Sequence, residues 1–312
     1  MGLTADDLAP LRGGLLAFCY QLLGSPFDAE DVVQDTMERA WRARETFDPA
    51  VASLSTWTFR IARNVCFDRL RDSPRRPLPR DLSDPGIEVG APLVPALDVP
   101  WLMPAPTSWW EDSEPERAAV AADGARLAVT AVLQALPPHQ RGVFILRDVL
   151  GHSAAETAAI LELSVTAVNS ALQRARAAVR ERTLRPARLR RETIKDYAEA
   201  IEQGDVAALA ALVAADVVFE MPPMPQWSSG RETYADFMAH LFARRGTRWA
   251  TRPISANGQP GILLTLVTDA GQQPHTVQLF DASAAGAAIG HVLVYQDLRL
   301  FALFEQDLAA HR

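Results

Sequence analysis

Four side chains that can hydrogen-bond to nucleobases lie close together in the middle of the chain. They are Asn169, Ser170, Gln173 and Arg174. In the major groove of DNA, Asn and Gln can bond to adenine and Arg to guanine. Helical periodicity places these side chains on one face of a helix, opposite the apolar Val168 and Leu172. The pattern indicates a DNA-reading surface, and an ordinary pair of packed helices is the alternative.

Basic charge is concentrated in two stretches of the chain. The net charge is −7, yet residues 165–192 hold eight arginines and two glutamates, a local charge of +6. Seven more arginines lie between Arg60 and Arg80, whereas residues 193–312 carry a net charge of −5. Basic stripes of this kind are typical of phosphate-binding surfaces. A solvated helical face gives the same pattern.

Composition excludes several classes of protein. The chain has 312 residues, of which 48% are hydrophobic, and this favours two or three folded domains over disorder. No apolar run reaches about 18 residues, so we expect no membrane span, and the acidic residues 1–7 do not resemble a secretory leader. Two cysteines, Cys19 and Cys66, fit a reducing cytoplasm rather than a disulfide scaffold. The six histidines lack metal-ligand spacing and there is no glycine-rich phosphate loop, so no metal or cofactor is expected.

Hydrophobic periodicity predicts helices up to about residue 190. The expected helices span about 8–23, 28–43 (capped by Asp28), 55–71, 118–136, 137–151, 153–163 and a last one that Thr166 caps. Ser153 and Glu156 have the spacing of a capping box at the start of the second-last helix. Because a short turn joins the last two helices, the pair is predicted to be a helix-turn-helix.

A proline-rich segment separates the helical regions. Ten of the 22 prolines fall between Pro74 and Pro115, so we expect an extended linker there. It contains Trp101, Trp109 and Trp110, which indicate that it docks either on a partner or on a neighbouring domain of the same chain.

The last third of the chain has a different pattern. Two helices are expected over 193–203 and 205–213, followed by strands over 217–221, 262–268, 276–281 and 288–297. Helices followed by a run of strands predict an α+β domain with a curved sheet.

Four stretches in this order resemble a group 4 sigma factor, the extracytoplasmic-function type of the sigma-70 family. They are residues 20–35, 57–71, 136–153 and 168–176. The resemblance implies a multidomain protein with two all-α sigma domains, the second of them a helix-turn-helix. It places sigma region 2 at 1–73, a proline-rich linker at 74–117 and sigma region 4 at 118–185.

The resemblance also implies roles for particular residues. The residues that would bind core RNA polymerase are Asp31, Gln34, Asp35, Arg39 and Trp41. Those that would bind and open the −10 element are Trp57, Arg60, Arg63 and Asn64, with a core position as the alternative for Trp57. The residues that would contact the bases of the −35 element are Asn169, Ser170, Gln173 and Arg174. Arg176 would contact its phosphates.

Residues 193–312 resemble the SnoaL-like and ketosteroid-isomerase-like domains, which have the cone-shaped α+β NTF2-like fold. The resemblance rests on residues 197–205 and 215–223. Tyr197 matches the family's tyrosine, but Met221 stands where the isomerases have their aspartate base, and methionine cannot take a proton. We therefore expect no enzyme activity. A pocket lined by Tyr197, Phe219, Met221 and Trp227 is one interpretation, and a filled core is the other.

Taken together, these features predict a cytoplasmic alternative sigma factor that binds core RNA polymerase and promoter DNA. The C-terminal domain is expected to contact the sigma domains within the same chain and to regulate them. Two alternatives remain at this point. One is a helix-turn-helix regulator that binds operators without polymerase, and the other is an isomerase or cyclase-like enzyme fused to a DNA-binding module.

Overall fold

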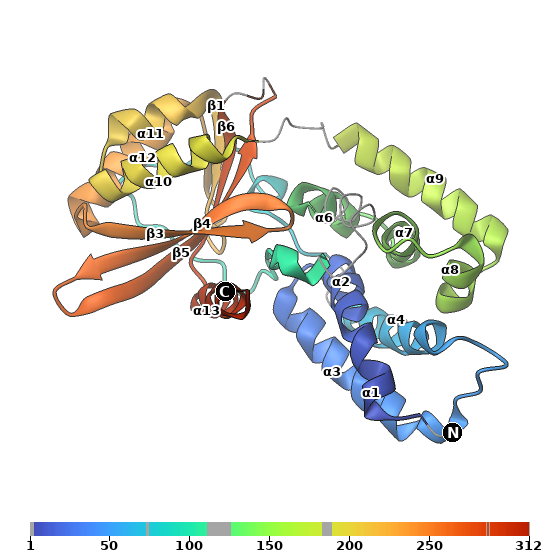
Figure 1. The fold of residues 1–312 in the computed structure, drawn as a ribbon. Helices are drawn as coiled ribbons and strands as arrows, with labels where there is room; N and C mark the ends of the chain where they lie inside the picture. The colour runs from blue at the N-terminus through green and yellow to red at the C-terminus, as the bar shows by residue number, and fades with distance from the viewer. Residues whose placement is uncertain are drawn as a thin grey trace. The chain divides into compact units, whose positions relative to one another are not determined.

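The computed structural model describes residues 3–72, 75–110, 126–182, 189–284, 286 and 288–311, and these form two compact units (Figure 1). The N-terminal unit combines residues 1–76 with 102–183, and the C-terminal unit combines 77–101 with 184–312. Each unit therefore contains a part of the proline-rich segment.

The described elements of the N-terminal unit are all helical. Its elements are α1 (Ala5–Leu8), η1 (Ala9–Leu11), α2 (Arg12–Leu23), α3 (Pro26–Arg42), η2 (Arg44–Thr46), α4 (Leu54–Asp72), η4 (Thr107–Trp110), α6 (Leu127–Gln134), α7 (Pro138–Phe144), the π turn η5 (Ile145–Val149), α8 (Ala154–Leu161) and α9 (Val165–Arg182). These bounds confirm the expected helices to within a few residues. The exception is the helix expected from residue 118, whose first part lies outside the described residues.

The start of α3 differs from the expectation. The Ser25 hydroxyl, rather than the Asp28 carboxylate, caps the helix by accepting a hydrogen bond from the Asp28 amide at 3.3 Å. Pro26 occupies the first helical turn, where its missing amide hydrogen costs nothing. The cap of this helix therefore lies three residues earlier than expected.

The helix-turn-helix is confirmed, with α8 and α9 joined by a three-residue turn. The Ser153 hydroxyl accepts the Glu156 amide at 3.1 Å and the Glu156 carboxylate accepts the Ser153 amide at 2.7 Å, so the capping box is present. At the start of α9, Ser164 caps in place of Thr166, because its Oγ accepts the Ala167 amide at 3.1 Å.

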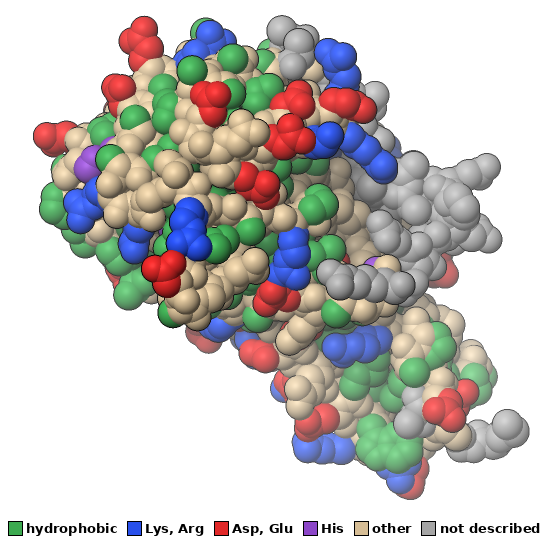
Figure 2. Space-filling model, turned by 60° about the vertical axis from the view of Figure 1, so that its left-hand side comes forward, with side chains coloured by type: hydrophobic (Ala, Val, Ile, Leu, Met, Phe, Trp, Pro, Cys, Tyr) green, Lys and Arg blue, Asp and Glu red, His purple; other side chains and the backbone are tan. Residues whose placement is uncertain are grey.

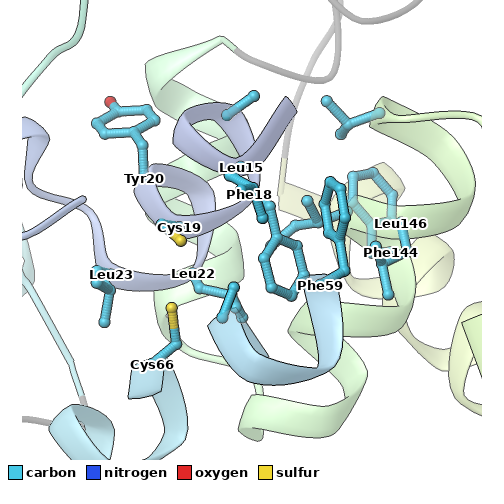
Figure 3. Packing of buried hydrophobic residues seen from close by; sticks show 14 of the residues in the cluster. Leu15, Phe18, Cys19, Tyr20, Leu22, Leu23, Phe59, Cys66, Phe144 and Leu146 are labelled. Atoms are coloured by element: carbon cyan, nitrogen blue, oxygen red, sulfur yellow. The ribbon is translucent and has the colours of Figure 1, made fainter. Parts of the chain in front are cut away.

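A single hydrophobic core holds the N-terminal unit together. Side chains of α2 and α4, such as Phe18 and Phe59, lie in the same buried cluster as Phe144 and Leu146 near the end of α7 (Figure 3). Trp110, from the proline-rich segment, is also in this cluster and packs edge-on against Tyr20. Trp109 packs against Tyr20 as well. Both tryptophans therefore contact a domain of their own chain.

The C-terminal unit is an α+β fold. Its elements are η3 (Pro79–Asp81), α10 (Arg191–Gln203), α11 (Val206–Leu212), β1 (Val213–Glu220), β2 (Trp227–Ser229), α12 (Arg231–Arg245), β3 (Trp249–Ala256), β4 (Gln259–Thr268), β5 (Gly271–Ala282), β6 (Ile289–Tyr295) and α13 (Leu298–Ala310). The strand order is β2-β1-β6-β5-β4-β3, and β1 and β6 pair in parallel while the other neighbours are antiparallel.

Helices cover both faces of this sheet. Helices α10, α11 and α12 share a buried cluster with alternate residues of the strands, such as Ile262 and Leu264 of β4. Leu263, between them, is also buried but lies outside that cluster, and α13 packs on β5 (Figure 1). Because both faces are covered, apolar side chains follow one another without alternation from Ile262 to Leu264 of β4. The face that Figure 2 presents of this unit mixes acidic and basic side chains without a patch of one sign.

Candidate nucleic-acid and protein interfaces

The side chains expected to bind core RNA polymerase follow the outer side of α3. They are Asp31, Gln34, Asp35, Arg39 and Trp41. Arg39 Nε donates a hydrogen bond to Asp35 Oδ1 at 2.9 Å, an i,i+4 pair that holds both side chains along the helix. The Trp41 ring is 43% exposed, and the Arg44 guanidinium lies 4.5 Å from its centroid. An exposed tryptophan among charged side chains has the composition of a protein-binding surface.

The side chains expected to bind the −10 element lie on α4, and the structure separates them by exposure. Asn64 faces solvent, and Trp57 is half-buried against Phe47, with 5.2 Å between the ring centroids. Arg60 and Arg63 both pair with the carboxylate of Glu162.

The carboxylate of Glu162 pairs with both arginines of α4. Arg60 Nη2 lies 3.1 Å from Glu162 Oε1, and Arg63 Nη2 lies 2.9 Å from Glu162 Oε2. The two guanidinium groups, that of Arg63 first, lower the pKa of Glu162. Sequence reasoning missed this residue, because a glutamate at the end of a short helix looks like ordinary surface.

The outer face of α9 carries the side chains expected to read the −35 element. Asn169, Ser170, Gln173 and Arg174 are all exposed, whereas Val168, Leu172 and Ala175 are buried against the rest of the unit. The periodicity of the sequence is therefore reproduced as two distinct faces. The four polar side chains lie within two turns of each other, which is the span that a recognition helix uses in the major groove.

Arg176 occupies a different environment from its neighbours on α9. Its Nε and Nη2 each lie 2.7 Å from an oxygen of Asp148, a bidentate pair within the same unit. The hydrogen bonds to Asp148 raise the pKa of Arg176. This arginine is expected to meet phosphate, and in the structure it is oriented by Asp148.

Comparison with known proteins shows the family to which the chain belongs. Residues 9–76 match the family model described as Sigma-70 region 2, residues 126–179 match Sigma-70, region 4, and residues 194–288 match the SnoaL-like domain. The chain is 36% identical over 307 residues to the ECF RNA polymerase sigma factor SigG of Mycobacterium tuberculosis, which covers 95% of this chain and 81% of that protein. The chain belongs to the extracytoplasmic-function (ECF) sigma factors.

A second ECF sigma factor, SigJ, is similar in sequence and in fold. SigJ of Mycobacterium tuberculosis is 30% identical over 224 residues, which is 70% of this chain and 64% of SigJ. The crystal structure of SigJ has the same fold, with a TM-score of 0.61 at 23% identity over 96% of this chain and 98% of that one. The fold prediction is thereby confirmed, with helical sigma domains followed by an NTF2-like domain.

The interior of the C-terminal unit of this sigma factor is closely packed around two tyrosines. The Tyr197 and Tyr234 hydroxyls are 2.7 Å apart, and the Tyr197 hydroxyl donates to Gln278 Oε1 at 3.3 Å. Burial raises the pKa of both tyrosines. Phe219 and Met221 lie in the same buried cluster. The structure therefore brings three of the four expected pocket residues together as core.

The fourth expected pocket residue, Trp227, contacts the proline-rich segment instead. Its Nε1 donates a hydrogen bond to the Ser83 carbonyl at 2.8 Å, and its own carbonyl accepts the Gly86 amide at 2.8 Å. Because β2 is an edge strand of the sheet, these bonds occupy a part of the edge that would otherwise be unpaired. Composition alone could not have placed Trp227 here rather than inside the cone.

A buried carboxylate anchors the same segment nearby. Glu220 is fully buried, and its oxygens accept hydrogen bonds from the Arg80 amide at 2.8 Å and lie 2.7 Å from His291 Nε2. Burial would raise the pKa of Glu220, but His291 and Arg80 outweigh it and the pKa is lowered. Alternation along β1 places Glu220 on the face opposite Phe219, and Glu220 lies outside the core cluster of Phe219.

Neither a membrane span nor a metal cluster is found in the described ranges. No helix there is both long and apolar enough to cross a membrane. In the same part of the chain, no three His, Cys, Asp or Glu side chains are grouped so that they could hold a metal ion.

Proposed function

We propose that this ECF sigma factor binds core RNA polymerase through the outer face of α3 and directs it to a class of promoters in the cytoplasm. In this proposal α9 reads the −35 element and α4 binds the −10 element. The chain contributes recognition rather than catalysis. The position of Met221 in place of a base, and the burial of Tyr197, support a C-terminal unit without isomerase activity.

The observation that carries this proposal is the exposed polar face of α9. It presents side chains that suit base edges on the second helix of a helix-turn-helix, in a chain related over almost its whole length to an ECF RNA polymerase sigma factor. An operator-binding regulator would use the same helix but would leave the exposed Trp41 and the charged face of α3 without a role.

We further propose that the C-terminal unit regulates the sigma factor by holding its linker. Besides the bonds to Trp227 and Glu220, the Ala96 amide donates to the Pro223 carbonyl at 2.9 Å. Ile87 and Leu93 pack on the apolar cluster of the unit. The contacts are spread from Arg80 to Ala96, so the segment is held along its length rather than at one point.

Holding this segment shortens the connection between the two promoter-binding regions. The connection runs from the end of α4 at Asp72 to the start of α6 at Leu127, which is 54 residues. Fully extended it could span about 180 Å, and the 25 residues from 77 to 101 account for about 80 Å of that length. Release of the segment would therefore widen the range of separations that α4 and α9 can reach.

Run-off transcription with core polymerase tests both parts of the proposal. Wild-type protein should give transcripts that depend on its addition. The double substitution Arg80→Ala and Trp227→Phe removes the ion pair of Arg80 Nε with Glu220 Oε2, 3.4 Å apart, and the hydrogen bond to the Ser83 carbonyl. We expect it to raise the transcript yield severalfold.

The matched control is Arg248→Ala, which removes an exposed ion pair to Asp269 in the same unit. A yield equal to wild type in the double variant would contradict regulation through the linker. No dependence on the added protein at any promoter would contradict the sigma-factor proposal itself.

A further inference from the structure

The promoter-binding helix α4 and the helix-turn-helix share one buried core in the structure. Phe59 of α4 is 3% exposed and belongs to the same cluster as Val143 of α7 and Leu161 of α8. The two regions are therefore in apolar contact rather than merely tethered. The side of α4 that makes this contact also carries residues expected to bind the −10 element.

Two aromatic pairs extend this contact along α4. The ring of Phe59 lies 5.2 Å from His152, which precedes α8, and the ring of Phe67 lies 4.9 Å from His139 in α7. Burial lowers the pKa of both histidines, and the charge of Arg63 lowers that of His139 further. Both rings are therefore packed in their neutral form near pH 7.

Glu162, at the turn of the helix-turn-helix, pairs with Arg60 and Arg63, which fall between Phe59 and Phe67 along α4. Its backbone is left-handed, with φ of 56°, where it ends α8, and it directs one carboxylate oxygen to each of Arg60 and Arg63. The Arg63 side chain is only 8% exposed, so its charge is largely removed from water and compensated by this carboxylate. Arginine side chains bind carboxylates and phosphates with the same donor geometry, so a DNA phosphate would suit the same two arginines.

We propose that Glu162 acts as an internal substitute for a DNA phosphate, so that the helix-turn-helix and the −10 strand compete for the same surface of α4. This inference rests on the proposed function, because it needs α4 to bind the −10 strand. The helix-turn-helix has to leave Arg60 and Arg63 before DNA can reach them. The sigma factor thus masks one of its DNA-binding surfaces with the other until polymerase separates them.

The test compares full-length wild type with Glu162→Gln, which removes the negative charge at nearly constant shape. Hydrogen exchange should show faster exchange of α8 and the following turn, by roughly twofold to tenfold, since part of the ion pair is exposed. Run-off transcription at limiting polymerase should rise by a similar factor. Glu181→Gln, an exposed glutamate of α9, is the matched control for the change in net charge and should leave exchange at α8 unchanged.

Three results would overturn the proposal, and each is distinguishable from failure of the proposed function. Wild-type transcription with unchanged exchange in Glu162→Gln means that Glu162 does not hold the two regions together. Faster exchange without more transcript means that the contact does not compete with DNA. An equal rise in Glu181→Gln means that general charge, not this contact, is responsible. Arg60→Gln provides a second variant, because it should also speed exchange at α8 if the pair is needed.

Discussion

A buried guanidinium joins the two halves of the N-terminal unit, and its removal should destabilise that unit strongly. Arg141 of α7 is 1% exposed. Its guanidinium donates to the Leu22 carbonyl at the end of α2, to the carbonyls of Gln134 at 2.9 Å and Leu136 at 3.2 Å, and to Gln134 Oε1 at 3.1 Å. Burial lowers the pKa of Arg141 to about 10, so the side chain still carries its charge near pH 7.

The magnitude follows from the acceptors that would lose their donor. Arg141→Met keeps most of the apolar stem but removes the guanidinium donor from two buried carbonyls, those of Leu22 and Gln134, and from the half-buried carbonyl of Leu136. A buried carbonyl left without a donor costs about 1–3 kcal/mol. Relief from burying a charge offsets part of this loss. We expect the free energy of unfolding to fall by about 3 kcal/mol, a large share of the roughly 5–15 kcal/mol that a domain has.

Urea unfolding followed by tryptophan fluorescence measures this change. Arg39→Met, at an exposed position on α3, serves as the control and should change stability by less than about 0.5 kcal/mol. Arg141→Lys keeps the charge but cannot reach all the acceptors, so it should fall between the two. If Arg141→Met unfolds at the wild-type urea concentration, the carbonyls are satisfied in another way and the reasoning is refuted.

Three further predictions concern thiols, DNA reading and pH. Cys19 and Cys66 are buried with their sulfur atoms facing each other (Figure 3), and burial raises the pKa of Cys19, so a thiol reagent should react only after unfolding. Arg174→Ala should cost about 1–3 kcal/mol of promoter affinity at one base position. Run-off on promoter point variants measures this, and an equal loss on every sequence would argue against base reading. The lowered pKa values of His139 and His152 mean that their contribution to stability is full above pH 6.5 and is lost as the pH falls below it. The urea concentration at the unfolding midpoint should therefore be lower at pH 5.5 than at pH 7.5. This difference should be smaller in a variant in which His139 and His152 are both replaced by Asn.

Local signals in the sequence were sufficient for the sigma regions. The helices and the capping box at Ser153 depend on contacts within a few residues, which periodicity and spacing report directly. The exposed face of α9 follows from the same periodicity. The caps of α3 and α9 were expected at Asp28 and Thr166 but lie at Ser25 and Ser164. The expectation was wrong because several neighbouring residues could have capped each helix.

Features that depend on distant contacts were not predictable in this way. Helices α12 and α13 and strands β2 and β3 were missed, since their patterns are short or weakly amphipathic and their formation depends on the sheet. The roles of Glu162 and Glu220 depend on partners roughly 100 and 70 residues away. Trp227 could equally have filled the cone or bound the linker, because composition does not distinguish two apolar surroundings.

The most direct test of the account is run-off transcription by core RNA polymerase on candidate promoters, with and without the full-length protein. The account predicts transcripts that appear only when the protein is added and that weaken when Arg174 is replaced by alanine. If the protein binds duplex DNA tightly by itself but never supports a transcript with core polymerase, the sigma-factor account is contradicted and an operator-binding regulator replaces it.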